Sequence, residues 1–194
     1  MLGPLEGAVV DLYAGTGALG FEALSRGARS VVFVENAKAA LVAIERNASA
    51  LEVRQQTTLV RAPVERARGA IERLGPYDLI LTDPPWTDMD AAERALRTLL
   101  RAGLLVPGGR VVLGHPKGRP VDLDPASGLV LTQRRSWGDS AASFFTRPTD
   151  STHEAPPHRD PPDQAPFAHD GASHDGAPRD EAATPTRAPS DPSI

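Results

Sequence analysis

The chain has 194 residues, 40% of them hydrophobic, which is enough for one ordinary domain with an apolar core. It contains no cysteine, and this excludes disulfides, thiolate metal sites and a catalytic thiol and favours an intracellular protein. It shows neither a signal peptide nor the run of roughly 18 apolar residues that a membrane helix needs, so we expect a soluble, cytoplasmic protein with no membrane association.

The composition changes after Arg147. Ten of the 19 prolines and four of the five histidines lie in residues 148–194, with nine acidic residues and only three arginines. Because Phe167 and Ile194 are the only bulky apolar side chains there, the segment cannot offset the entropy of ordering its backbone. We therefore expect one folded domain over residues 1–147 and a disordered, acidic tail rich in Pro, Asp and His over residues 148–194. A His-Asp repeat at 168–177 is interpreted as linker rather than as a metal site.

Strand and helix patterns alternate along the folded part. The first apolar run stops at Gly15, a later helix has Asn36 as its expected N-cap, and another has Pro63 at its first helical position. The expected strands are residues 8–13, 31–34, 57–60, 77–82, 110–113, 129–134 and 142–146, and the expected helices are residues 19–26, 37–51, 63–74 and 91–102. This order predicts an α/β fold with a parallel sheet covered on both faces, which binds its ligand beyond the carboxyl ends of the strands.

A glycine-rich loop follows the first expected strand. Residues 15–20 match the pattern G-x-G-x-x-G, and Glu35 lies 20 residues after Gly15 at the end of the next strand. Such a loop accepts either the pyrophosphate of a dinucleotide or the methionine carboxylate of S-adenosylmethionine. Glu35 would hold ribose hydroxyls in both cases, or it would cap a helix, so the loop predicts a nucleoside site without choosing the ligand.

Asp11 lies inside the first apolar strand, where an unpaired carboxylate would be expensive to bury. We expect it to order the glycine loop or to meet the ammonium group of the ligand. The alternative is that it only bonds to neighbouring loop amides.

The sequence Asp83-Pro84-Pro85-Trp86 follows the fourth expected strand, and its two prolines predict a rigid, extended turn. The amine of a nucleic-acid base is a poor nucleophile, and acceptors on its two N–H bonds localise its lone pair. The Asp83 carboxylate and the Pro84 carbonyl can supply these acceptors, while Trp86 offers a face for stacking an extruded base. The motif therefore predicts methyl transfer to an exocyclic amine. Guanine, with two donors on its Watson–Crick edge, suits a carboxylate, although aspartate also serves adenine enzymes.

With these residues in view, residues 9–146 resemble the RsmD family of bacterial 16S ribosomal RNA guanine-N2 methyltransferases. The similar segments are residues 10–20, 22–28, 31–35, 83–86 and 135–140. The resemblance implies a class I, Rossmann-like methyltransferase domain over residues 1–147, with a seven-stranded sheet whose last strand is antiparallel. It also implies S-adenosyl-L-methionine as cofactor, and 16S rRNA or a small-subunit assembly intermediate as the partner of a monomer.

The residues expected at the site combine the motifs with this resemblance. Those expected to bind the cofactor are Asp11, Tyr13, Ala14, Gly15, Thr16, Gly17, Gly20, Glu35 and Ala62. Those expected to be catalytic are Asp83, Pro84, Pro85 and Trp86, and no metal is expected. An RNA-facing patch of Lys117, Arg119, Arg134 and Arg135 is as well explained by surface charges that contact nothing.

The sequence departs from the family pattern in two places. Only residues 1–8 precede the first strand, whereas family members have a few dozen residues there, including a basic segment that contacts RNA. A truncated chain or a late start codon would explain this, and it leaves open a non-catalytic cofactor or RNA binder. After the third strand the family usually has an acidic residue, but this chain has Arg61-Ala62-Pro63, so adenine contacts are expected from the backbone. A nicotinamide-dependent oxidoreductase, the other alternative, would leave the motif at 83–86 unexplained.

Overall fold

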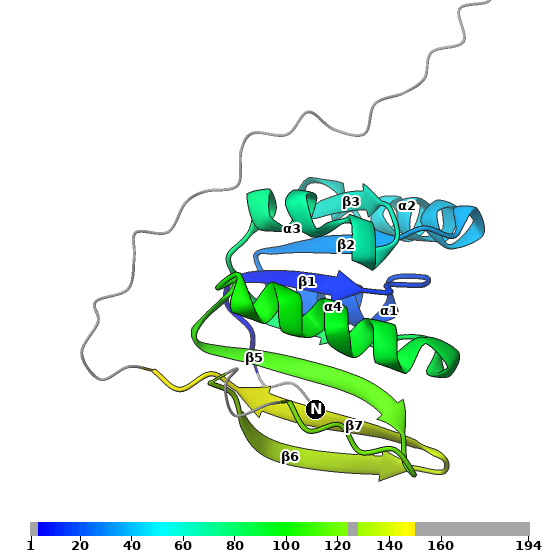
Figure 1. The fold of residues 1–194 in the computed structure, drawn as a ribbon. Helices are drawn as coiled ribbons and strands as arrows, with labels where there is room; N and C mark the ends of the chain where they lie inside the picture. The colour runs from blue at the N-terminus through cyan, green and yellow to red at the C-terminus, as the bar shows by residue number, and fades with distance from the viewer. Residues whose placement is uncertain (1–3, 124–127, 150–194) are drawn as a thin grey trace, which may run out of the picture.

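The structure, a computed structural model, describes residues 4–123 and 128–149. Seven strands form one sheet in the order β3-β2-β1-β4-β5-β7-β6 (Figure 1). They are β1 (Ala8–Leu12), β2 (Ser30–Glu35), β3 (Thr57–Arg61), β4 (Tyr77–Thr82), β5 (Leu105–Pro116), β6 (Val130–Trp137) and β7 (Ser140–Thr146). The pairs within β1 to β5 are parallel, and β7 runs antiparallel to both β5 and β6. The predicted seven-stranded sheet with an antiparallel final strand is confirmed.

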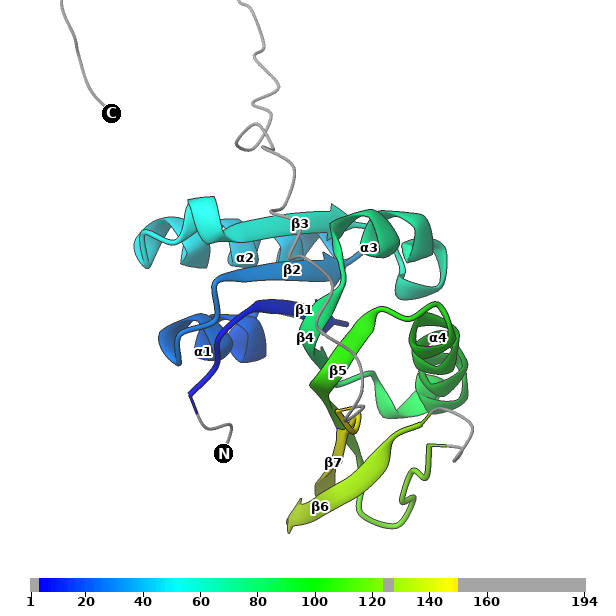
Figure 2. The ribbon, with the colours of Figure 1, turned by 90° about the vertical axis from the view of Figure 1, so that its left-hand side faces the viewer.

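Among the described residues, two α-helices pack on each face of the sheet. Helices α1 (Ala18–Ser25) and α2 (Lys38–Ala50) lie on one face, and α3 (Arg68–Leu74) and α4 (Met89–Arg101) lie on the other (Figure 2). Val10 and Ile80 belong to the apolar cluster under α3 and α4, whereas Val9 and Leu79 belong to the cluster under α1 and α2. This alternation buries β1 and β4 on both faces.

On the α1 side of the sheet, no helix in the described part of the chain covers β5, β7 and β6 (Figure 2). Side chains on this side of β5, such as Val112 and Gly114, are half-buried, while Val111 and Leu113 on the opposite side are fully buried. Every residue of β6 is exposed. We call this surface of β5, β7 and β6 the open face.

The structure corrects three local expectations. Ala37, not Asn36, occupies the N-cap position of α2. The helix expected over residues 63–74 is divided into a short 3-10 helix, η2 (Val64–Arg66), and α3, and Pro63 precedes η2 with extended backbone. Strand β5 runs from Leu105 to Pro116, so it begins five residues before the expected strand of residues 110–113 and also extends beyond it.

Two further short 3-10 helices, η1 (Arg54–Gln56) and η3 (Trp86–Asp88), precede β3 and α4. No helix among the described residues is long and apolar enough to cross a membrane. Apart from Pro148 and Thr149, the expected tail, with its His-Asp repeat, lies outside the described residues.

The strand order reverses at β1, which has β2 on one side and β4 on the other. The connections after these strands leave the sheet in different directions, and α/β proteins bind ligands beyond the carboxyl ends of the strands at such a reversal. The glycine loop, Glu35 and Asp83 all follow or end these three strands. The fold thus brings the three predicted elements of the site to one edge of the sheet.

Candidate active site

The glycine loop joins β1 to α1 in a compact turn. The Gly17 N–H donates to the Ala14 carbonyl at 2.8 Å. Gly15 and Gly17 have φ angles of 54° and 82°, in the left-handed region that glycine adopts without strain. Gly20 is required for packing, because a Cβ there would lie 2.2 Å from the ring of Phe33. Close contact between α1 and β2 therefore fixes the start of the helix beside the carboxyl ends of the strands.

Glu35 ties the glycine loop to the start of α2. One carboxylate oxygen, Oε2, accepts a hydrogen bond from the Gly15 N–H at 2.8 Å. The other, Oε1, accepts from the N–H groups of Asn36 at 2.7 Å and Ala37 at 2.8 Å. These amides precede the first helical residue, Lys38, so Glu35 orders the turn between β2 and α2, and α2 has no side-chain cap. The role of Glu35 toward ribose stays a prediction.

Asp11 is buried beneath the glycine loop, with 1% of its surface exposed. Its Oδ2 accepts a hydrogen bond from the Gly20 N–H at 2.9 Å, in the first turn of α1. The pKa of Asp11 is raised to about 8, chiefly by burial. The hydrogen bond from Gly20 acts in the opposite direction, and the negative charges of Asp83 and Glu35 add to the increase. The carboxyl groups of Asp11, Glu35 and Asp83 therefore interact electrostatically at the carboxyl edge of the sheet. The bond to Gly20 fits both the ordering role and the alternative of bonds to loop amides alone, and a contact of Asp11 with the ligand's ammonium group stays a prediction.

Asp83 follows β4 and rests on the neighbouring strand. A Cβ added to Gly114 of β5 would lie 2.1 Å from Asp83 Oδ1, so the carboxylate lies directly over the glycine. Asp83 remains exposed, and within residues 4–123 and 128–149 its carboxylate has no hydrogen-bond or ion-pair partner. Partial burial raises the pKa of Asp83 above its ordinary value. An acceptor without a partner is therefore available at the carboxyl edge of the sheet.

The rest of the motif forms a turn into η3. Pro84 is buried, and the Pro85 carbonyl accepts a hydrogen bond from the Asp88 N–H at 2.9 Å. Trp86 begins η3 with 50% of its surface exposed, so its ring is accessible from solvent. Thr82, just before Asp83, has a buried hydroxyl with no partner among the described residues.

The other residues expected to bind the cofactor follow β1 and β3 at the carboxyl edge of the sheet. Tyr13 has a φ of 58°, unusual for a residue other than glycine, and its hydroxyl donates to Glu65 Oε1 at 2.8 Å. Thr16 is exposed, and its carbonyl accepts a hydrogen bond from Asn47 Nδ2 at 3.1 Å. The N–H of Ala62 donates to Val60 at 3.1 Å, just after β3. These residues lie at the same edge of the sheet as the glycine loop, and their contacts with the cofactor stay predictions.

A buried hydrogen-bond chain supports the end of β5, and sequence reasoning missed it. His115 Nδ1 lies 2.9 Å from the Pro116 carbonyl, which can only accept, so we assign the proton to Nδ1. His115 Nε2 then accepts from the Ser143 hydroxyl at 2.9 Å, and Ser143 Oγ accepts from Arg134 Nε at 3.0 Å. The chain connects β5, β7 and β6 beside Gly114. No local pattern could predict it, because His115 and Ser143 are 28 residues apart.

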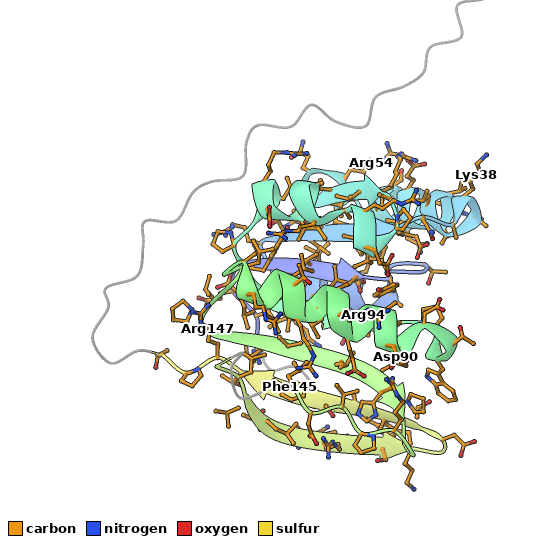
Figure 3. All side chains as sticks on the ribbon, viewed as in Figure 1. Lys38, Arg54, Asp90, Arg94, Phe145 and Arg147 are labelled. Atoms are coloured by element: carbon orange, nitrogen blue, oxygen red, sulfur yellow. The ribbon has the colours of Figure 1, made fainter. Side chains whose placement is uncertain are left out.

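The cations expected to face RNA divide into two pairs. Arg119 forms ion pairs with Asp90, labelled in Figure 3, and with Glu93, and Arg134 pairs with Asp122 at 2.9 Å. Lys117 and Arg135 are exposed and have no ion pair in the part of the chain that the structure describes. Arg119 and Arg134 are therefore not charges that contact nothing, while Lys117 and Arg135 keep charges without an ion pair among the described residues. Within the same residues, no cluster of three or more His, Asp or Glu side chains could hold a metal ion.

Comparison with known proteins gives a consistent result. The family model described as "Conserved hypothetical protein 95" matches residues 4–146. The chain is 32% identical over 152 residues to "Putative rRNA methyltransferase YlbH" of Bacillus subtilis, covering 76% of the chain and 80% of that protein. It is 28% identical over 134 residues to "Ribosomal RNA small subunit methyltransferase D" of Haemophilus influenzae, covering 64% of each.

Solved structures share the fold. A conserved hypothetical protein from Streptococcus pyogenes has a TM-score of 0.68 at 27% identity, covering 77% of the chain and 91% of that protein. "Putative methyltransferase yhhF from Escherichia coli" has a TM-score of 0.64 at 24% identity, covering 74% and 77%. The second likeness concerns the fold alone.

Proposed function

The chain belongs to the RsmD family of methyltransferases, and from its site we propose that it transfers a methyl group from S-adenosyl-L-methionine to the exocyclic N2 amine of a guanine in small-subunit ribosomal RNA. The partner in this proposal is 16S rRNA or an assembly intermediate of the small subunit, bound by one copy of the chain. The names of the two curated relatives support ribosomal RNA as the substrate class.

The carboxylates near the glycine loop favour S-adenosylmethionine over a nicotinamide dinucleotide as the cofactor. Gly15 and Gly20 already donate their N–H groups to Glu35 and Asp11, so two amides of the loop are taken by side chains of the protein. A pyrophosphate would bring negative charge toward Glu35 and Asp83, which like-charge repulsion opposes. A ligand with a sulfonium and an ammonium group is attracted instead. This favours S-adenosylmethionine over a nicotinamide dinucleotide.

The start of α1 suits the remaining charged group of that ligand. The amides of Ala18 and Leu19, in the first turn of α1, have no acceptor within the helix. We assign them to the methionine carboxylate, which the helix N-terminus would stabilise. Asp11 lies beside Gly20 of the same turn, where the ammonium group of the ligand would stabilise its ionised form directly or through water.

Asp83, Pro84 and Trp86 would act on the substrate. When bound, the cofactor supplies a methyl group on positively charged sulfur, which is already activated for transfer. The free Asp83 carboxylate would accept one N–H bond of the guanine amine, and the Pro84 carbonyl the other, so that the nitrogen lone pair points at the methyl carbon. Asp83 would also accept the proton that the amine nitrogen loses on methylation. Trp86 would stack against the extruded base.

Two measurements test this proposal. Calorimetric titration should show binding of S-adenosylhomocysteine and no binding of NADH; the reverse would support an oxidoreductase. Labelled S-adenosylmethionine should then methylate 16S rRNA or small-subunit intermediates. Transfer should disappear from oligonucleotides in which inosine, which lacks the N2 amine, replaces guanine. Transfer that survives this replacement would refute guanine N2 as the acceptor, and cofactor binding with no transfer to any RNA would favour a non-catalytic binder.

A further inference from the structure

The open face of the sheet begins directly beside Asp83. Gly114, under the Asp83 carboxylate, pairs with Ala142 of β7, and Ala142 pairs with Arg135 of β6. Residues directly opposite each other in antiparallel strands project from the same face. Asp83, Gly114, Ala142 and Arg135 therefore form one row across the sheet.

The two central residues of this row have little or no side chain, and the row ends at the positively charged Arg135. Gly114 has no side chain and Ala142 has only a methyl group, so they form a floor between Asp83 and Arg135. Three strand spacings of about 4.8 Å place the two backbones on the order of 14 Å apart, a distance that one nucleotide and an extended arginine can span together. The row therefore connects the free carboxylate to a free guanidinium on one accessible surface.

An exposed aromatic ring lies next to Arg135. Trp137 is two residues farther along β6, on the same face, with 58% of its surface exposed. Lys117 follows the end of β5, and its N–H donates to the Asp139 carbonyl in the turn after β6, at 2.8 Å. An aromatic face beside uncompensated cations matches a single-stranded nucleic acid, whose bases stack and whose phosphates need positive charge.

We propose that Arg135 and Trp137 bind the nucleotide next to the target guanine, Arg135 through its phosphate and Trp137 by stacking on its base. This inference rests on the proposed function, since the target base must reach Asp83 for its neighbour to lie over Gly114 and Ala142. Arg134 is excluded from this role because its guanidinium is held by Ser143 and Asp122. Arg135 and Trp137 are then contacts for the RNA strand and not for the cofactor.

The tryptophan content allows a direct test, because Trp86 and Trp137 are the only two in the chain. In a Trp86→Phe variant all tryptophan fluorescence comes from Trp137. Titration with a single-stranded fragment of 16S rRNA should quench it in a saturable way. Adding Arg135→Ala should weaken binding at least about fivefold and reduce the slope of log affinity against log salt by about one. Arg46→Ala, which removes an exposed charge on α2 at the opposite end of the sheet, is the matched control and should do neither.

Kinetics of otherwise unchanged protein provide the second readout. Trp137→Ala should raise KM for RNA at least about fivefold while kcat stays within about threefold, and Trp137→Phe should restore most of the loss. Affinity for S-adenosylhomocysteine should be unchanged in all variants, which shows that they fold. If the wild-type chain binds and methylates RNA while Trp137 is silent and both substitutions behave like Arg46→Ala, this inference is wrong and the proposed function stands. If S-adenosylhomocysteine binds but RNA is neither bound nor methylated, both are wrong.

Discussion

Asp11 and Asp83 lie near each other at the carboxyl edge of the sheet, but their surroundings differ. Asp11 is buried and bonded to Gly20, whereas Asp83 is exposed and has no partner among the described residues. The first carboxylate is therefore suited to holding the site together, and the second to receiving a substrate.

The separation of roles predicts the effect of removing the Asp83 carboxylate. Asp83→Ala should lower the rate of methyl transfer at least about 100-fold, because the amine loses an acceptor in the transition state. Cofactor affinity should change no more than a few-fold, since no bond joins Asp83 to the glycine loop in the described residues. Single-turnover transfer and calorimetry measure the two quantities. A large loss of cofactor affinity would instead place Asp83 in the cofactor pocket.

The raised pKa of Asp11 predicts how stability depends on pH. The pKa is about 8 in the folded protein and near 3.8 in the unfolded chain, so the folded state holds the proton more tightly. The stabilisation is fully present below pH 3.8 and is lost as the pH rises through 8. Asp11→Asn, whose amide oxygen can still accept from Gly20, should flatten this component. Denaturant unfolding of both proteins between pH 5 and 8 tests it, and identical pH dependence would contradict it.

The pairing of β4 with β5 determines where the Asp83 side chain lies. The register places Leu113 opposite Thr82, so the next residue, Gly114, meets the side chain of Asp83. A side chain at Gly114 would displace the end of a flexible carboxylate rather than the backbone. The site and the stability of the fold should therefore respond differently to a substitution there.

Gly114→Ala should lower the rate of methyl transfer at least about tenfold because it moves Asp83. The free energy of unfolding should change by less than about 1 kcal/mol. Gly118→Ala is the control, since a Cβ there would meet nothing within 4 Å. Full transfer by Gly114→Ala would show that the position of Asp83 over Gly114 is unimportant for catalysis.

At the scale of the whole molecule, charge is unevenly divided along the chain. Residues 150–194 contain nine acidic residues and three arginines, which makes this segment repel RNA. Deleting it should raise RNA affinity a few-fold at low salt, with the difference fading as salt screens the charges. Cofactor affinity should stay constant. Equal RNA affinities of the two forms at low salt would contradict this prediction.

Local patterns in the sequence were enough to predict the strands, the glycine loop and the Asp-Pro-Pro-Trp turn, because each depends on neighbours in the chain. The sequence could not predict that Glu35 bonds to the N–H groups of Gly15, Asn36 and Ala37, since this depends on how β2 ends relative to the glycine loop. It likewise could not show that Arg119 and Arg134 are paired, nor that Gly114 lies under Asp83. These contacts join residues far apart in sequence, and only the packed sheet brings them together.

The outer edge of β6 has a consequence for behaviour at high concentration. An edge strand presents unpaired N–H and C=O groups on which a strand of another molecule can add. Here the pairing with β7 shifts register between Leu131 and Gln133, and Arg135 places on the strand a positive charge that has no ion pair among the described residues. Both features oppose stacking of identical copies, since each new copy would bring its own Arg135 against the one already present. The arginine that we propose binds the RNA strand would thus also oppose edge-to-edge association of copies of the chain.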